Sequence, residues 1–148
     1  GFDNQNKNYY YVVRDRGGQD YGYFVPWDLN ISFGMVYADN EYYSEDLLSV
    51  ATEPVIWQPA QRMIELDADG AKADLKKTWK KWRKGVFSDE AITERIKNLE
   101  HRVKDSGAFA REDARYPNGN QREDFSYIYD FAIQRLSYVD SYVDELCR

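Results

Sequence analysis

Three side chains near the start of the sequence have the types and order that phosphoryl transfer requires. Asp3 and Asn8 form the pattern Asp-x-x-x-x-Asn just ahead of an aromatic run, and Asp28 closely follows a second run. In this chemistry one carboxylate orients or deprotonates the attacking hydroxyl, while an amide and a second carboxylate hold magnesium on the nucleotide phosphates. The order predicts Asp3 as the base or orienting group, and Asn8 and Asp28 as the magnesium ligands that bind the cofactor.

A structural role fits the same residues. Asp3 and Asn8 are typical of side chains that cap a turn, and Asp28 is typical of a cap on the segment that follows it. The spacing alone leaves both interpretations open, because Asp-x-x-x-x-Asn occurs by chance in many proteins.

The elements around these residues are expected to be two strands. Residues 9–13 and 21–25 are rich in Tyr, Phe and Val, and the segment 14–20 between them holds Gly17 and Gly18. Two such runs around a glycine-containing segment predict a β-hairpin. Pro26 lacks an N–H and should end the second strand or lie at an edge. This hairpin would hold both ends of the pattern on one rigid base.

The remainder of the sequence predicts helices. Short ones are expected over 47–51 and 59–66, the latter ended by the segment 67–70. Ser88 has the type of a helix N-cap, and Asp89 and Glu90 would complement the helix dipole. Apolar residues spaced by three and four give three helical faces. These faces comprise Leu75, Trp79, Trp82 and Val86; then Ile92, Ile96, Leu99 and Val103; and finally Phe125, Ile128, Ala132, Leu136 (or Arg135), Val139, Val143 and Leu146. Residues 116–120 are expected to form a loop.

Composition narrows the class of protein. The chain has 148 residues, suited to one α+β domain, and a net charge of -6, which argues against a nucleic-acid-binding protein. No apolar run is long enough to span a membrane, and no signal peptide is visible within the sequence. Tyr, Phe and Trp make up 16% of the residues, which favours core filling over a binding role.

Several further features favour a structural interpretation. His101 is the sole histidine and Cys147 the sole cysteine, so a histidine-based metal site, a Ser-His-Asp triad and an internal disulfide are excluded. The segment 67–72 hints at a calcium loop but is expected to be a turn, because Ala71 and Lys72 supply no side-chain oxygen. The basic cluster 76–84 is expected to be a solvated helix face. The knot of Arg111, Asp113 and Arg115 is expected to brace the helices by ion pairs.

The sequence resembles the CotH family of atypical, spore-coat-type protein kinases. The resemblance is carried by residues 8–15, Asn-Tyr-Tyr-Tyr-Val-Val-Arg-Asp, and by residues 23–34, which contain Pro-Trp-Asp-Leu followed by Ser-Phe-Gly. Residues 87–90 and 110–116 are similar to the family's C-terminal helices. The resemblance touches most of the chain, and its most specific part is residues 3–34.

The resemblance implies a protein-kinase-like fold that transfers the terminal phosphate of ATP to serine, with Mg²⁺ as cofactor and a coat or surface protein as substrate. Asp3 matches the catalytic-loop aspartate, Asn8 the amide of that loop, and Asp28 the metal-binding aspartate. Asn30 would be a further metal ligand, although the family more often has aspartate there. It also implies a spore-coat or exported setting.

The same resemblance suggests that the chain is the C-terminal portion of a kinase domain, with residues 1–34 carrying the catalytic loop, hairpin and metal-binding Asp28, and residues 45–148 the helices. Its 148 residues contain no glycine-rich phosphate loop. We therefore expect the N-terminal part of the domain to be a partner, and the isolated chain to be inactive.

Two other functions stay open. The first is a non-catalytic kinase-fold module that mediates interactions in a spore-coat or exported assembly, which Asn30 and the abundant Tyr and Trp favour. The second is a glycan-binding module that uses exposed aromatic rings, for which the sequence contains no motif.

Overall fold

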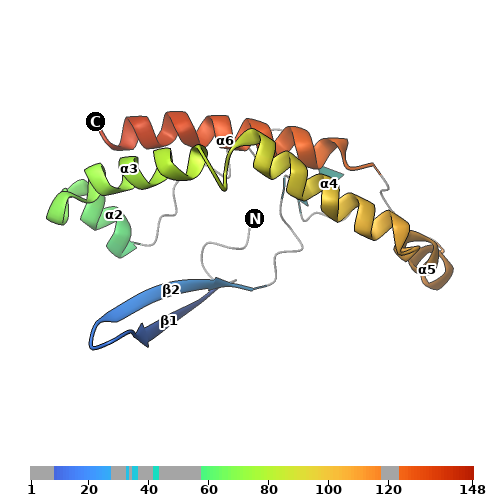
Figure 1. Ribbon diagram of the computed structural model, residues 1–148, viewed down its shortest axis with the longest axis horizontal. Coiled ribbons are helices and arrows are strands. Elements are labelled where there is room, and N and C mark those ends of the chain that lie inside the picture. The colour runs from blue at the N-terminus through green and yellow to red at the C-terminus, as the bar shows by residue number, and fades with distance from the viewer. Residues whose placement is uncertain (1–8, 28–32, 34, 37–41, 44–57, 118–123) are drawn as a thin grey trace. The chain divides into compact units, whose positions relative to one another are not determined.

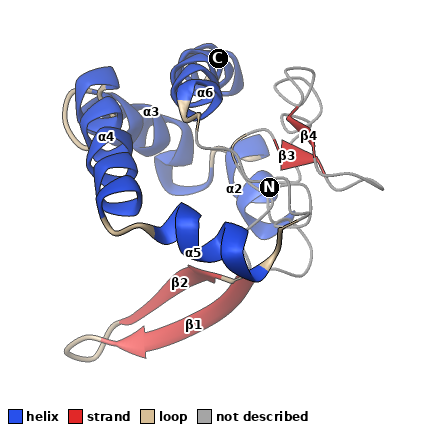
Figure 2. Ribbon diagram, turned by 90° about the vertical axis from the view of Figure 1, so that its right-hand side faces the viewer, coloured by secondary structure: helices blue, strands red, loops and turns tan. Residues whose placement is uncertain are grey.

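The computed structural model describes residues 9–27, 33, 35–36, 42–43, 58–117 and 124–148. The chain forms two compact units, residues 1–65 and 66–148. Among the described residues, the first unit contains the strands and the helix α2 (Gln58–Glu65), and the second contains four α-helices. The predicted α+β class, a hairpin followed by a mainly helical region, is confirmed (Figure 2).

The hairpin consists of β1 (Tyr9–Asp15) and β2 (Asp20–Pro26), paired antiparallel from Tyr9↔Pro26 to Asp15↔Asp20. Each strand is longer than the predicted run, and β2 ends at Pro26 as expected. Gly17 and Gly18 adopt φ angles of 69° and 86°, which residues with a Cβ atom rarely adopt. The Asp15 carboxylate accepts a hydrogen bond from Gly18 N–H at 2.7 Å, which fixes the turn.

A second, shorter pairing joins β3 (Met35–Val36) to β4 (Tyr42–Tyr43), with Met35 opposite Tyr43. The sequence did not predict this pair, because two-residue strands leave no alternating pattern to detect. The helix predicted over 47–51 lies outside the described residues. The helix predicted over 59–66 is confirmed as α2.

The helical unit is built along α6 (Ser126–Leu146). Both α3 (Ala71–Arg83) and α4 (Asp89–Asp105) contact α6, α3 toward its C-terminal end and α4 toward its N-terminal end (Figure 1). The short helix α5 (Ala108–Arg115) packs on α4. No helix in the described part of the chain has the length and apolar character of a membrane span.

The core of this unit lies between α4, α5 and α6. Ile96, Phe125 and Ala132 are buried together, and Ile92, Phe109, Ile128 and Tyr129 pack against them. Leu136 and Val143 are buried further along α6, as predicted, whereas Phe131 is buried without having been predicted. Leu136 rather than Arg135 therefore occupies the buried position in the α6 stripe.

Three predicted inward positions are wrong, and one of them is Trp82, which is 46% exposed. Leu99 is 53% exposed, so the inner face of α4 consists of Ile92, Ile96 and Val103. The α3 stripe ends early, because α3 stops at Arg83 and Val86 is 48% exposed. The turn after α3 brings Phe87 against Trp79 and Trp82, at ring centroid distances of 5.9 and 5.8 Å. Phe87 thus takes the position that the spacing had assigned to Val86.

The predicted caps and turns are largely confirmed. Ser88 Oγ accepts a hydrogen bond from Ala91 N–H at 3.1 Å, as an N-cap should. The segment after α2 is a turn in which Asp67 accepts from the backbone N–H of Lys72 at 3.0 Å. The Asp67 carboxylate therefore stabilises the turn. No cluster of potential metal ligands occurs among the described residues.

Candidate functional site

The predicted site residues Asp3, Asn8, Asp28 and Asn30 all lie outside the described residues, so their roles stay predictions. Asn8 directly precedes β1, and Asp28 is separated from β2 by Trp27 alone. The pairing of Tyr9 with Pro26 brings the first residue of β1 opposite the last residue of β2. The open end of the described hairpin is therefore where the two predicted ligand segments join it.

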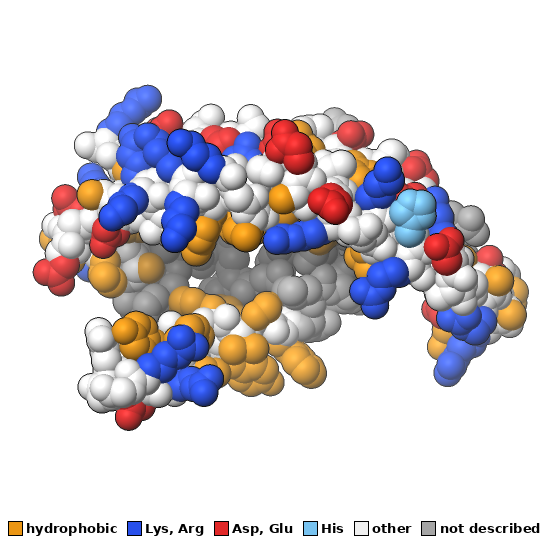
Figure 3. Space-filling view, viewed as in Figure 1, with side chains coloured by type: hydrophobic (Ala, Val, Ile, Leu, Met, Phe, Trp, Pro, Cys, Tyr) orange, Lys and Arg blue, Asp and Glu red, His pale blue; other side chains and the backbone are white. Residues whose placement is uncertain are grey.

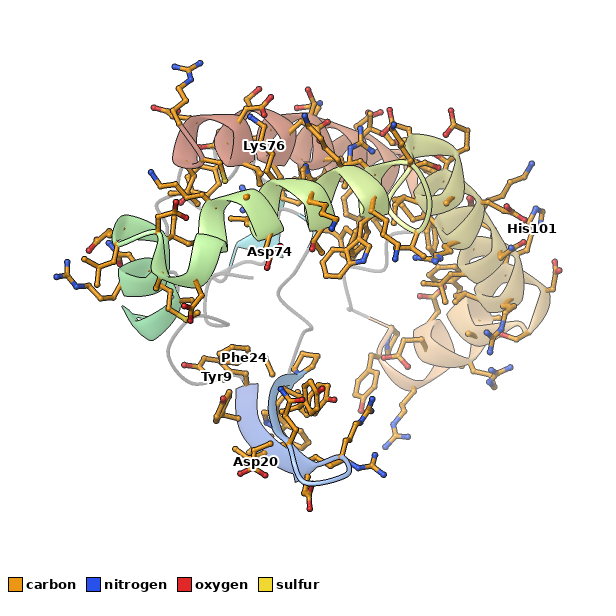
Figure 4. The ribbon with its side chains drawn as sticks, turned by 60° about the vertical axis from the view of Figure 1, so that its left-hand side comes forward. Tyr9, Asp20, Phe24, Asp74, Lys76 and His101 are labelled. Carbon is orange, nitrogen blue, oxygen red and sulfur yellow. The ribbon has the colours of Figure 1, made fainter. Side chains whose placement is uncertain are left out.

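Aromatic rings pair across the two strands of the described hairpin. The ring of Phe24 contacts those of Tyr9 and Tyr11, at centroid distances of 5.1 and 5.4 Å, and Figure 4 shows Tyr9 beside Phe24. Near the open end the ring of Tyr10 lies 6.2 Å from that of Trp27. Such edge-on and tilted aromatic pairs across strands each stabilise a hairpin by about 0.5–1.5 kcal/mol. Aromatic contacts are therefore concentrated next to the positions that adjoin Asn8 and Asp28.

A glycine lets one ring cover the opposite strand. Gly22 and Tyr11 are diagonal neighbours in the hairpin register, and a Cβ built on Gly22 would meet the Tyr11 hydroxyl oxygen and ring edge. The Tyr11 ring thus occupies the space above Gly22, an arrangement that compensates for a glycine within a strand. The pattern of residue types in the hairpin accordingly reflects packing across its two strands.

Charged side chains in the helical unit form a structural network. Asp140 on α6 accepts hydrogen bonds from the indole N–H of Trp79 at 2.8 Å and from Arg83 Nε at 3.0 Å to each oxygen. Arg83 Nη1 also donates to the carbonyl of Phe87 and to the Asp89 carboxylate, the latter at 2.8 Å. This network ties α3 to α6 and to the start of α4.

The network shifts the pKa of Arg83 upward. Partial burial of the guanidinium opposes its charge, but the hydrogen bonds and charges of Asp89 and Asp140 together outweigh that cost, so the pKa is raised. Arg83 had been expected on the solvated face with the neighbouring lysines. That expectation is wrong for Arg83, because its side chain is only 20% exposed.

A second polar contact joins α4 to α6. Glu100 accepts from Lys104 Nζ at 2.6 Å and from the Tyr129 hydroxyl at 2.9 Å. These hydrogen bonds, that of Lys104 first, lower the pKa of Glu100. Burial first and then Glu100 raise the pKa of Tyr129, so that the hydroxyl stays a donor.

The remaining candidates from the sequence behave as surface residues. His101 is exposed on α4 (Figure 4). Arg111 donates to the carbonyl of Ser106 at 2.5 Å, next to the end of α4, and the Arg115 guanidinium lies 5.4 Å from the ring centroid of Tyr116. Both arginines thus stabilise the ends of helices, although ion pairs had been expected for this knot.

Comparison with protein families connects these elements. The family model described as CotH kinase protein matches residues 1–139, which span the predicted site segments, the hairpin and most of the helical unit. The chain belongs to the CotH family. Neither the curated proteins nor the solved structures contain a match to this CotH family chain.

Proposed function

We propose that this chain provides the catalytic-loop and metal-binding portion of an ATP- and magnesium-dependent protein serine kinase of the CotH family. The observation that carries the proposal is the hairpin from Tyr9 to Pro26, which stands between Asn8 and Asp28 within the region matched by the CotH kinase model. The α+β order of the described elements is compatible with a kinase C-terminal lobe, which we include in the proposal.

The donor set fits the implied cofactor. A carboxamide oxygen from Asn8 and carboxylate oxygens from Asp28 are hard ligands of the kind that Mg²⁺ prefers, and phosphates and water supply the others. When bound, the magnesium nucleotide would supply the transferable phosphoryl group and neutralise its charge. Asn30 would add an amide oxygen in place of the more usual carboxylate.

Within this proposal each residue has a separate task. Asp3 would orient the substrate serine hydroxyl and accept its proton, while Asn8 and Asp28 would hold the magnesium ion of the nucleotide. The paired strands keep both ligand segments on one base, which limits the reorganisation needed before transfer. The substrate class is a protein of a spore coat or other exported assembly.

The experiment is phosphate transfer from labelled ATP by the full-length protein that contains these residues, with and without Asp28→Ala. We expect the rate to fall by a factor of about 100 or more, because an electrostatic ligand of the transferred group is lost. Asp20→Ala, an exposed aspartate at the far end of the same hairpin, is the matched control and should leave the rate unchanged. Equal rates for Asp28→Ala and the unaltered protein would exclude the metal-binding role.

A second candidate is a non-catalytic kinase-fold module. It is favoured by the exposed aromatic rings of the hairpin, among them Tyr10 at 58% and Trp27 at 60% exposure, and by Asn30. Calorimetry with magnesium and ATP separates the two functions. Binding by the full-length protein supports the kinase, whereas the absence of binding supports the module. We expect the isolated chain to bind little nucleotide, since its 148 residues contain no phosphate-covering glycine loop.

A further inference from the structure

Four lysines form a continuous stripe along α3 and its C-cap. Lys77, Lys80, Lys81 and Lys84 occupy positions i, i+3, i+4 and i+7, which share one helix face, and all four are exposed. This set is called the lysine stripe below. The sequence contains no Asp or Glu from residue 75 to residue 88, so no carboxylate on α3 itself alternates with these charges. Figure 3 shows Lys and Arg side chains gathered over α3.

The side of α3 that faces α6 is already occupied. Trp79 and Arg83 contact Asp140, and Lys76 Nζ pairs with Asp144 Oδ1 at 3.0 Å, so residues 76, 79 and 83 define the side facing α6. Lys77, Lys81 and Lys84 lie outside that side, and Lys80, four residues after Lys76, lies at its border. Among the described residues, Lys77, Lys81 and Lys84 have no ion pair. Their charges are therefore available to a partner.

Carboxylates confine the stripe on both flanks. Asp74 and Lys76 emerge on opposite sides of α3 in Figure 4, and Asp144 lies on the Lys76 side. The contact with Lys76 first, and then the charge of Lys80, lower the pKa of Asp144, so this carboxylate marks the edge of the stripe nearest α6. Because charges are screened over about 8 Å in physiological salt, the surface that attracts anions is about one helix face wide.

These dimensions select the kind of partner. The stripe from Lys77 to Lys84 is about 10 Å long at a helical rise of about 1.5 Å per residue. An extended polypeptide covers that length with about three to four residues. A membrane or a long nucleic acid would bring a broad anionic surface against Asp74, Asp144 and a chain of net charge -6, which repels it.

The residue type points the same way. Arginine is the usual residue where a phosphate is recognised by paired hydrogen bonds. The single arginine of segment 76–84, Arg83, already donates its hydrogen bonds within the fold. Lysines supply flexible point charges, which suit carboxylates at irregular spacing.

We propose that the lysine stripe of α3 is a docking surface for an acidic polypeptide segment, a run of about three to four Asp or Glu residues on a partner protein. The interaction is electrostatic, because the four ammonium groups are exposed. It is independent of the nucleotide chemistry proposed for Asp3, Asn8 and Asp28.

The test uses fluorescence anisotropy of the full chain with a labelled peptide of four glutamates flanked by Gly and Ser, at low and at high salt. We expect saturable binding that weakens at least tenfold at high salt, and a glutamine version of the peptide should not bind. The variant Lys77→Gln, Lys81→Gln, Lys84→Gln should weaken binding at least fivefold. The same three positions changed to Arg should retain it.

The matched control removes three positive charges elsewhere, by Lys97→Gln, Arg102→Gln and Arg115→Gln, all exposed in the unaltered chain. It should bind nearly as the unaltered chain does. Circular dichroism verifies that each variant keeps its helix content, because lysines near a helix C-terminus also favour the helix dipole. Absence of peptide binding, equal loss in both glutamine variants, or tighter binding to anionic vesicles or polyphosphate than to the peptide would overturn the proposal.

Discussion

Different interactions stabilise the hairpin and the helical unit. In the hairpin, β1 pairs with the next element in the sequence, and rings such as Tyr10 and Phe24 stay 58% and 48% exposed. In the helical unit, Phe131 and Leu136 are each only 9% exposed, and Asp140 bonds to Arg83 from 57 residues away. The first therefore depends on local pairing, and the second on burial and contacts between distant segments.

The difference matters for function. A two-stranded hairpin alone is marginally stable in water, so its order depends on turn geometry and cross-strand rings. The predicted catalytic and metal-binding residues adjoin this locally stabilised element, whereas the lysine stripe belongs to the unit with the buried core. Substitutions in the two regions should consequently affect stability and activity in different proportions.

The largest effect on stability should separate two phenylalanines. Phe131→Ala should lower the free energy of unfolding by about 3–5 kcal/mol, because it opens a cavity in the helical core. Phe24→Ala should lower it by about 1 kcal/mol, since a half-exposed ring loses mainly its contacts with Tyr9 and Tyr11. Urea unfolding followed by circular dichroism measures both. Equal losses would mean that the hairpin is as deeply packed as the helices.

A medium effect should arise at the polar network between α3 and α6. Asp140→Ala leaves the Arg83 guanidinium and the Trp79 indole N–H without their shared acceptor. We expect a loss of about 1–2 kcal/mol, reduced by solvent because Asp140 is 42% exposed. Asp130→Ala, exposed on the same helix, is the control in the same unfolding experiment. A loss no larger than that of the control would show that the network does not stabilise the helical unit.

The smallest effect should be the acid dependence of the link between α4 and α6. Lys104 and Tyr129 lower the pKa of Glu100 in the folded chain, so its contribution is complete above the ordinary glutamate pKa of about 4.3. It is lost as the pH falls through the lowered folded-state value. Glu100→Gln should make the thermal midpoint less sensitive to acidification below that pH, compared with Glu94→Gln. An unchanged acid dependence would show that the hydrogen bonds do not favour the ionised carboxylate.

Much of the fold could be predicted because its signals are local. The strands of the hairpin, the turn with Gly17 and Gly18 and the N-cap at Ser88 all depend on residues within a few positions of one another. The inward positions predicted for Trp82, Val86 and Leu99 were wrong. Periodicity describes an uninterrupted helix face and contains no information on where a turn ends that face or what packs opposite it.

The candidate site, unlike the fold, was predicted without contacts that the structure describes. Asp3, Asn8 and Asp28 were predicted from the order of residue types and from a resemblance, and membership of the CotH family is established over residues 1–139. Their catalytic and metal-binding roles stay predictions, as do the limits of the kinase domain, because ligand geometry depends on side-chain positions that the order of residues does not specify.

The sequence by itself determined the hairpin, the helical majority and the family, since each is encoded in residue types at short or fixed spacing. Only the tertiary structure decided that Arg83 is withdrawn into a network with Asp140 while Lys77, Lys80, Lys81 and Lys84 stay exposed. All five residues are cationic and belong to one basic segment, so residue type does not distinguish them. The side of α3 on which α6 packs does, and that packing depends on residues more than fifty positions away.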